Sequence, residues 1–123
     1  MIALDPIGYL RTPFETHVDA PRQGTESDAR GTIVLEPAYE PGLAGLRAGD
    51  DVEVLWLAHR ADRSALRVRD GERGVFATRS QDRPNPICLT RCPVLAVEGR
   101  RVSVAGVDAL DDSPVLDLKA PLR

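Results

Sequence analysis

Short runs of β-forming residues recur along the whole chain, separated by glycine, proline and aspartate turns. The clearest run is 51–59, where Val52, Val54, Trp56 and Ala58 occupy alternate positions. A period of two indicates a strand with one face in a core. Seven or eight such runs predict an all-β barrel or sandwich of mostly antiparallel strands. The expected strands are 2–10, 31–35, 51–59, 65–68, 74–78, 87–97, 101–107 and 115–118.

Other elements are few. One short helix is expected over 43–48, because Gly49 follows it as a typical helix end, and residues 36–42 are expected to turn the chain. Asp70-Gly71 and Glu98-Gly99 are typical of hairpin turns. Residues 11–30 contain two prolines and many polar side chains, which predicts a long loop. A loop of that length in a compact domain is usually functional or disordered.

The length of 123 residues predicts one domain over 1–123, large enough to fold without disulfides or metals. Cys88 and Cys92 lie four apart in one expected strand, too far apart along it for a disulfide, so we expect reduced thiols. No metal site is expected, because only His17 and His59 could join them. The chain has no apolar run long enough to cross a bilayer and no secretory signal, which predicts a cytoplasmic protein with no membrane contact.

Charge is unevenly distributed along the chain. The net charge is −3, but residues 60–91 carry eight arginines against four acids, whereas residues 1–59 carry four arginines against ten acids. Fifteen of the sixteen basic residues are arginine, which suits bidentate binding of carboxylate or phosphate. A solvated arginine-rich face is the alternative interpretation.

The stretch 73–90 combines rigidity with charge. Pro84 and Pro86 hold Arg83 and Asn85 in extended conformations, and Arg79 precedes them. Fixed donors between two strands could bind a ligand, or the stretch could be a stiff connection with solvated arginines. Phosphate-loop, dinucleotide and nucleophile-elbow motifs are absent from the sequence. If the barrel brings its polar loops together, the candidates for one site are 21–25, 59–60, 79–86 and 108–113.

Three motifs in order resemble one known family. They are Gly74-Val-Phe-Ala-Thr-Arg-Ser80, Arg83-Pro-Asn-Pro-Ile87, and the segment from Asp108 to Lys119 that ends in Pro-Val-Leu-Asp-Leu-Lys. Together with Ile7-Gly-Tyr-Leu-Arg-Thr-Pro-Phe14, Pro21-Arg-Gln23 and the segment ending at His59, they resemble the TsaA-like (YaeB/TrmO) family of β-barrel methyltransferases. The resemblance covers nearly the whole chain. It implies a barrel that binds S-adenosyl-L-methionine, acts as a homodimer and methylates the N6 nitrogen of threonylcarbamoyladenosine in tRNA.

The resemblance also implies roles for particular residues. The implied cofactor contacts are Gln23, Gly24, Thr25, His59, Arg60, Arg79, Leu89, Gly106, Val107 and Asp108. Arg83, Asn85, Asp111, Asp117 and Lys119 match motif positions that could contact substrate or support the site. A catalytic base is not identified. Asp108 is expected to serve the ribose or amino group of the cofactor, because a carboxylate against the sulfonium would stabilise the ground state more than the transition state.

This sequence departs from the family pattern at four places. Cys88 and Asp112 stand where the family usually has glycine, Asp50-Asp51-Val52-Glu53 replaces a Ser-His-Leu-Trp stretch, and the sequence ends at Arg123 without a further C-terminal region. Three hypotheses therefore remain open: a methyltransferase acting on modified adenosine in tRNA, a methyltransferase acting on a small metabolite, and a non-catalytic barrel that binds S-adenosyl-L-methionine or RNA.

Overall fold

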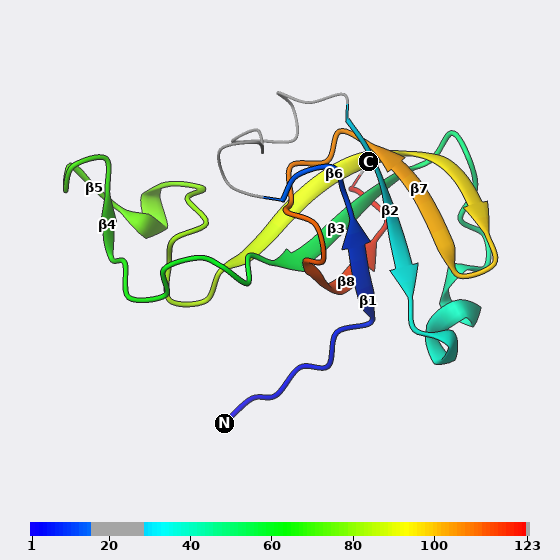
Figure 1. Cartoon of the computed structure of the whole chain (residues 1–123), viewed down its shortest axis with the longest axis horizontal. Coiled ribbons are helices and arrows are strands. Elements are labelled where there is room, and N and C mark those ends of the chain that lie inside the picture. Colours follow the sequence, from blue (N-terminus) through cyan, green and yellow to red (C-terminus); the bar gives the residue numbers. More distant parts are fainter. Residues whose placement is uncertain (16–28, 123) are drawn as a thin grey trace.

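A closed antiparallel barrel forms the body of the molecule (Figure 1). The computed structural model describes residues 1–15 and 29–122. The all-β prediction is confirmed, and so is the barrel that the family resemblance implies. It has six strands rather than seven or eight, because two further strands form a separate hairpin. In barrel order the strands are β1 (Gly8–Arg11), β2 (Arg30–Leu35), β7 (Arg101–Ala105), β6 (Ile87–Glu98), β3 (Asp51–Leu57) and β8 (Pro114–Lys119).

Strand β3 follows the predicted alternation. Val52, Val54 and Trp56 are buried, with at most 2% of each exposed. β3 pairs with β6 on one side and β8 on the other, so both of its edges are hydrogen-bonded. Its pairing with β6 places Trp56 opposite Cys88 and Val54 opposite Thr90. This register brings polar residues of β6 beside the indole ring.

Strand β1 is shorter than the expected 2–10 and begins at Gly8. A Cβ atom on Gly8 would lie 2.2 Å from the carbonyl oxygen of Val34. Only glycine allows this approach of β1 to β2, where Gly8 pairs with Leu35. The side chains of Leu10, Ile33 and Leu35 then fill the barrel from these two strands.

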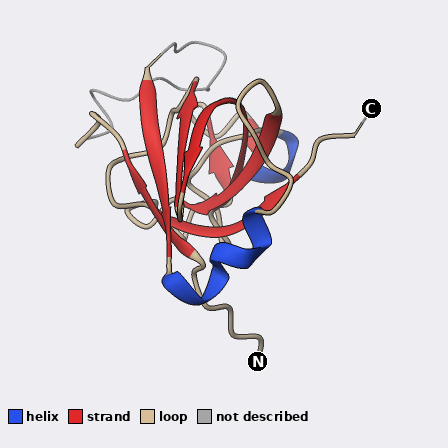
Figure 2. Ribbon diagram, turned by 90° about the vertical axis from the view of Figure 1, so that its right-hand side faces the viewer, coloured by secondary structure: helices blue, strands red, loops and turns tan. Residues whose placement is uncertain are grey.

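The expected helix over 43–48 is wrong. A 3₁₀ helix, η2 (Pro37–Leu43), forms earlier, in the segment expected to turn, and lies at one end of the barrel (Figure 2). Proline is favoured in the first turn of a helix, where its missing N–H is not needed. Gly45 and Gly49 have φ values of 91° and 94°, so the chain cannot remain helical through 43–49. No helix in the described part of the chain is long and apolar enough to cross a membrane.

Residues 59–86, between β3 and β6, stand away from the barrel and are called the arm (Figure 1). Strands β4 (Arg67–Val68) and β5 (Arg73–Gly74) pair around the predicted Asp70-Gly71 turn. The strand expected over 74–78 is wrong beyond β5, because a 3₁₀ turn, η3 (Val75–Ala77), follows. The Arg83 guanidinium donates to the carbonyls of Val75 and Thr78 and so holds both ends of this turn.

Candidate functional site

A cavity of about 150 Å³ lies where the arm joins the barrel. Its walls come from β3, from the start of β6, from the returning part of the arm and from the loop after β7. The lining residues are Trp56, Thr78, Arg79, Ser80, Gln81, Arg83, Ile87, Cys88, Leu89, Thr90 and Asp108. Arg79, Leu89 and Asp108, three of the predicted cofactor contacts, therefore meet in one cavity, together with Arg83.

A buried chain of hydrogen bonds fixes Asp108 in this cavity. The Trp56 indole Nε1 donates to Thr90 Oγ1 at 3.0 Å, and Thr90 Oγ1 donates to Asp108 Oδ1 at 2.7 Å. The direction follows from chemistry, because an indole N–H can only donate and leaves the single hydroxyl proton for the carboxylate. All three side chains are at most 7% exposed. The relay thus holds an acceptor group of fixed orientation in the cavity wall.

Two arginines of the arm line the other side of the cavity. Arg79 Nη2 donates to the carbonyl of Leu89 at 3.0 Å, which ties the arm to β6. Arg83 Nη2 donates to the carbonyl of Thr78 at 2.7 Å, while its Nε is buried without a hydrogen-bond partner among the described residues. A buried donor without a partner is rare in folded proteins. It is the kind of group that a bound ligand satisfies.

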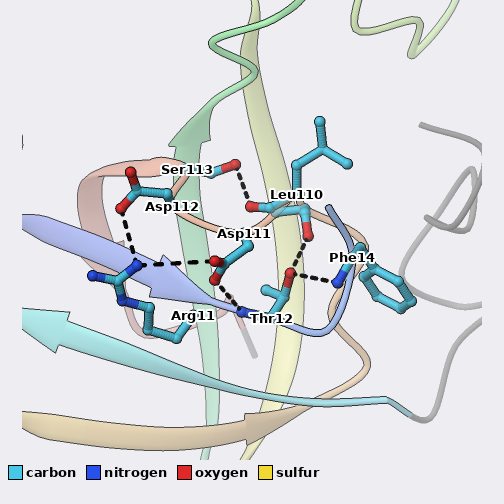
Figure 3. A network of polar contacts seen from close by, with 8 residues as sticks. Arg11, Thr12, Phe14, Leu110, Asp111, Asp112 and Ser113 are labelled. Carbon is cyan, nitrogen blue, oxygen red and sulfur yellow. Dashed lines mark hydrogen bonds and ion pairs between the residues drawn. The ribbon is translucent and has the colours of Figure 1, made fainter. Parts of the chain in front are cut away.

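The loop after β7 is clamped to the end of β1 (Figure 3). Asp111 Oδ1 accepts from the backbone N–H of Thr12 at 3.0 Å, and Arg11 forms exposed ion pairs with Asp111 and Asp112 at 3.9 and 3.3 Å. Asp112 has a φ of 68°, a left-handed conformation that aspartate tolerates better than most residues. Asp111 therefore supports the loop that carries Asp108 and does not line the cavity.

The same loop contains two further predicted cofactor contacts. Gly106 has a φ of 74°, and its N–H donates to the carbonyl of Ala29 at 3.0 Å. Val107 is 2% exposed and packs in the barrel core. Neither residue lines the cavity. Both position Asp108, which follows them directly in the chain.

Several other predicted residues lie away from the cavity. His59 and Arg60 are exposed in the turn after β3, and Arg60 donates to the carbonyl of Glu15 at 3.0 Å. Asn85 accepts from Arg63 at 3.3 Å. Asp117 and Lys119 form an exposed ion pair at 3.8 Å, which resolves the open choice between a buried and a surface pair. Gln23, Gly24 and Thr25 lie outside the described residues, as does His17.

Trp56 and Thr90 escaped the sequence-based list of site residues. Trp56 fits an apolar strand face, and threonine is common in strands, so neither residue type signals a site. The usable signal was the position of Thr90, which period two places on the buried face of β6 between Cys88 and Cys92. A hydroxyl on a buried face needs a partner, and Asp108 provides it.

Cys88 and Cys92 are free thiols, as predicted. Burial raises the pKa of the Cys88 thiol from 9.0 to about 11, and the negative charge of Asp108 adds to the shift. Burial raises the pKa of Cys92 to about 12. Cys88 therefore lines the cavity as a neutral thiol rather than a nucleophile. In the part of the chain that the structure describes, no group of three or more histidine, cysteine, aspartate or glutamate side chains could hold a metal ion.

The fold and the cavity define a class of protein: a small antiparallel barrel with a cavity at the base of a side arm, lined by two arginines and a buried aspartate. The chain belongs to the family of tRNA-methyltransferase O N-terminal domains, whose model matches residues 9–122. This assignment confirms the resemblance derived from the three sequence motifs.

Individual relatives span the chain almost completely. A "Probable S-adenosyl-L-methionine-binding protein" of Halobacterium salinarum is 50% identical over 119 residues, covering 95% of this chain and 96% of that protein. The "tRNA (adenine(37)-N6)-methyltransferase" of Mus musculus is 35% identical over 94% of this chain and 30% of its own length.

Solved structures agree with the fold. A crystal structure of TrmO superposes with a TM-score of 0.85 at 38% identity, covering 99% of this chain and 58% of that chain. TrmO from Pseudomonas aeruginosa superposes with a TM-score of 0.83 at 35% identity, covering 99% and 56%. The chain thus spans little more than half the length of these solved TrmO chains.

Proposed function

We propose that this protein binds S-adenosyl-L-methionine in the cavity between arm and barrel. We further propose that it transfers the methyl group to the N6 nitrogen of threonylcarbamoyladenosine in tRNA. The observation that carries the proposal is the meeting of Arg79, Arg83 and Asp108 in one cavity. The cofactor is the one in the name of the Halobacterium relative, and the enzyme class is the one in the family name.

The lining groups fit the chemistry of this cofactor. Its carboxylate suits a guanidinium such as Arg79, because arginine binds carboxylates through two parallel hydrogen bonds. Asp108 can accept from ribose hydroxyls or an amino group. The buried Nε of Arg83 needs an acceptor that the described residues do not supply. Ile87 and Leu89 offer apolar surface to a flat ring.

Catalysis in this cavity would depend mainly on positioning. S-adenosyl-L-methionine supplies an already activated methyl group, and alignment of two reactants can contribute on the order of 7–11 kcal/mol. Asp108 is the only carboxylate among the described lining residues, and the Thr90 hydroxyl already binds it. We therefore assign Asp108 to holding the ribose or amino group, away from the sulfonium, and we assign no residue as the base.

The outward face of β6 is the candidate surface for contact with a second copy of the chain. Ile87, Leu89 and Leu95 lie on the outward face of β6 and are 37–45% exposed. Ile87 and Leu89 also line the cavity, so a second copy packed over β6 would cover its entrance. We propose a homodimer formed there, acting on tRNA in the cytoplasm. Sedimentation velocity of the native chain and of a Leu95→Glu variant tests the dimer: the variant should be monomeric, and an unchanged sedimentation coefficient would disprove this interface.

A second candidate function has its own support. The Halobacterium relative, which this chain matches over 96% of that protein, is named for binding S-adenosyl-L-methionine and not for methyl transfer. A small metabolite could also be the methyl acceptor, because the cavity itself contains no feature specific to RNA. Turnover to S-adenosylhomocysteine separates the binding-only function from both enzymatic ones.

The decisive experiment joins binding to transfer. Calorimetry should detect S-adenosyl-L-methionine binding to the native chain and to Asp117→Asn, a surface control, but at least tenfold weaker binding to Asp108→Asn. Labelled methyl should then enter tRNA, and nucleoside mass spectrometry should find it on threonylcarbamoyladenosine. Binding without label in RNA would remove the tRNA assignment. Equal affinity of Asp108→Asn and the native chain would remove the proposed site.

A further inference from the structure

Positive charge is concentrated in the arm. Residues 59–86 contain seven arginines and four acids, giving +3, whereas the other nine basic and fifteen acidic residues give −6. The arm projects from the barrel next to the cavity (Figure 1). An otherwise acidic protein therefore presents one cationic extension, and that extension begins at the proposed methyl-transfer site.

The arginines of the arm hold backbone carbonyls instead of carboxylates. Arg67 donates to the carbonyl of Gly71 at 3.2 Å, and Arg73 donates to the carbonyl of Ala77 at 3.3 Å. The same kind of contact anchors Arg60 and Arg63. Carbonyl groups are neutral, so these contacts orient the guanidinium groups without cancelling their charge. In the described part of the chain, six arm arginines form no ion pair: Arg60, Arg63, Arg67, Arg69, Arg73 and Arg83.

Apolar side chains stand exposed among these charges. Phe76 is 82% exposed at the centre of η3, and Leu66 is 62% exposed beside β4. Val75, the neighbour of Phe76, is fully buried, so the stapled turn displays the aromatic ring outward. A cationic surface with an exposed ring is the combination that binds single-stranded nucleic acid, through phosphate contacts and stacking on bases.

We propose that the arm is a docking surface for RNA, with Arg67, Arg69 and Arg73 contacting phosphates and Phe76 stacking on an unpaired base. This inference rests on the proposed tRNA substrate and adds where the RNA is held. An RNA strand bound along the arm would lead to the cavity that contains Asp108. Cationic docking also explains how a chain of net charge −3 can bind a polyanion.

The test measures tRNA binding as a function of salt. A triple variant, Arg67→Gln with Arg69→Gln and Arg73→Gln, removes three positive charges from residues that do not line the cavity. Arg30→Gln with Arg47→Gln and Arg101→Gln removes the same charge from exposed positions outside the arm and outside β6. An unmodified tRNA transcript should bind the arm variant at least tenfold more weakly than the control variant. The slope of log K against log salt should fall by about 0.7–0.9 for each lost phosphate contact.

Two further variants act in opposite directions. Asp70→Asn with Glu72→Gln removes acids from the same hairpin and should tighten tRNA binding severalfold. Phe76→Ala should weaken binding without changing the salt slope, because stacking releases no counterions, whereas Tyr39→Ala, at another exposed ring, should leave binding unchanged. Calorimetry with S-adenosyl-L-methionine should give the native affinity in every variant and so verify that each one is folded.

The outcomes separate this inference from the proposed function. If the native chain binds tRNA and the arm variant binds it equally well, the docking surface is wrong and the tRNA substrate stands. If the native chain binds no tRNA at 50 mM salt, the proposed substrate fails and the inference fails with it. If the arm variants change the sedimentation coefficient and leave tRNA affinity unchanged, the arm binds a second copy of the chain and RNA docking is overturned.

Discussion

The barrel and the arm are held together in different ways. The barrel is a closed set of hydrogen-bonded strands around buried side chains such as Ile33, Val102 and Val115, each fully buried. The arm has one two-residue strand pair and two buried side chains, Val75 and Pro86. The turn η3 next to the cavity is held by the Arg83 guanidinium, which donates to the carbonyls of Val75 and Thr78. Burial of apolar side chains thus stabilises the barrel, whereas the arm is held mainly by directional hydrogen bonds.

This difference explains where the site is. Groups from the barrel, such as Asp108, are held in a rigid wall through Thr90 and Trp56. Groups from the arm, such as Arg79 and Arg83, are held by exposed or half-buried contacts that open more easily. A ligand at the junction therefore meets one fixed wall and one adjustable wall. Binding should order the arm more than the barrel.

The largest expected effect separates the two regions by stability. Ile33→Ala should lower the free energy of unfolding by about 2–5 kcal/mol, because it removes a fully buried side chain from the barrel. Phe76→Ala, at an 82% exposed position of the arm, should change it by less than about 0.5 kcal/mol. Urea unfolding followed by the emission of Trp56, the single tryptophan, measures both. A similar loss from Phe76→Ala would show that the Phe76 ring packs against the protein and would contradict its exposed position.

The Cys88 thiol tests the rigid wall through pH. Its pKa is raised from 9.0 to about 11, so the folded state favours the protonated thiol. The contribution of the protonated Cys88 thiol to the stability of the folded state is complete below pH 9 and is lost as the pH rises toward about 11. In a Cys92→Ala variant, iodoacetamide at pH 8 should therefore modify Cys88 about 100-fold more slowly than in the urea-unfolded chain. A folded rate within tenfold of the unfolded rate would contradict this burial, and bound cofactor should slow the reaction further.

The hydrogen-bonded relay from Trp56 through Thr90 to Asp108, in the barrel wall of the cavity, should show an intermediate effect. Thr90→Val keeps the shape of the side chain but removes the buried hydroxyl that accepts from the Trp56 indole and donates to Asp108, at a cost of about 1–3 kcal/mol. Cofactor affinity should fall about tenfold or more, and the emission maximum of Trp56 should shift. Thr90→Ser restores the hydroxyl and should restore both properties. Full cofactor affinity in Thr90→Val would show that the relay does not position Asp108.

The strands of the barrel could largely be predicted from sequence, because buried and exposed residues alternate along them. Burial on one face of β3 forces alternation at Val52, Val54 and Trp56, and that alternation is visible in the residues alone. Strand order and closure were not visible, because the register between β3 and β6 depends on how whole faces pack. Periodicity alone therefore left barrel and sandwich open, and it was the family resemblance that predicted the barrel.

The arm could not be predicted in this way. Val75, Phe76 and Thr78 have β propensity, yet Val75–Ala77 form a 3₁₀ turn because Arg83 binds the carbonyls at its two ends. A contact of this kind, between one side chain and two backbone carbonyls, does not repeat along the chain, so it leaves no periodic pattern in the sequence. The site shows the same division: family motifs pointed to Arg79 and Asp108, while the supporting hydroxyl of Thr90 was missed.

The smallest expected effect concerns the contact of Arg83 with the carbonyls of Val75 and Thr78. Arg83→Lys keeps the positive charge but replaces the planar fork of donors with a single ammonium group, which cannot reproduce the same geometry. The amide of Thr78, which donates to the carbonyl of Val75 at 3.1 Å, should exchange with solvent about tenfold faster. Amides of β3 should keep their native exchange rates, because the barrel ladders do not depend on Arg83. Faster exchange in β3 as well would mean that the arm and the barrel open together and that the contrast between them is not one of local stability.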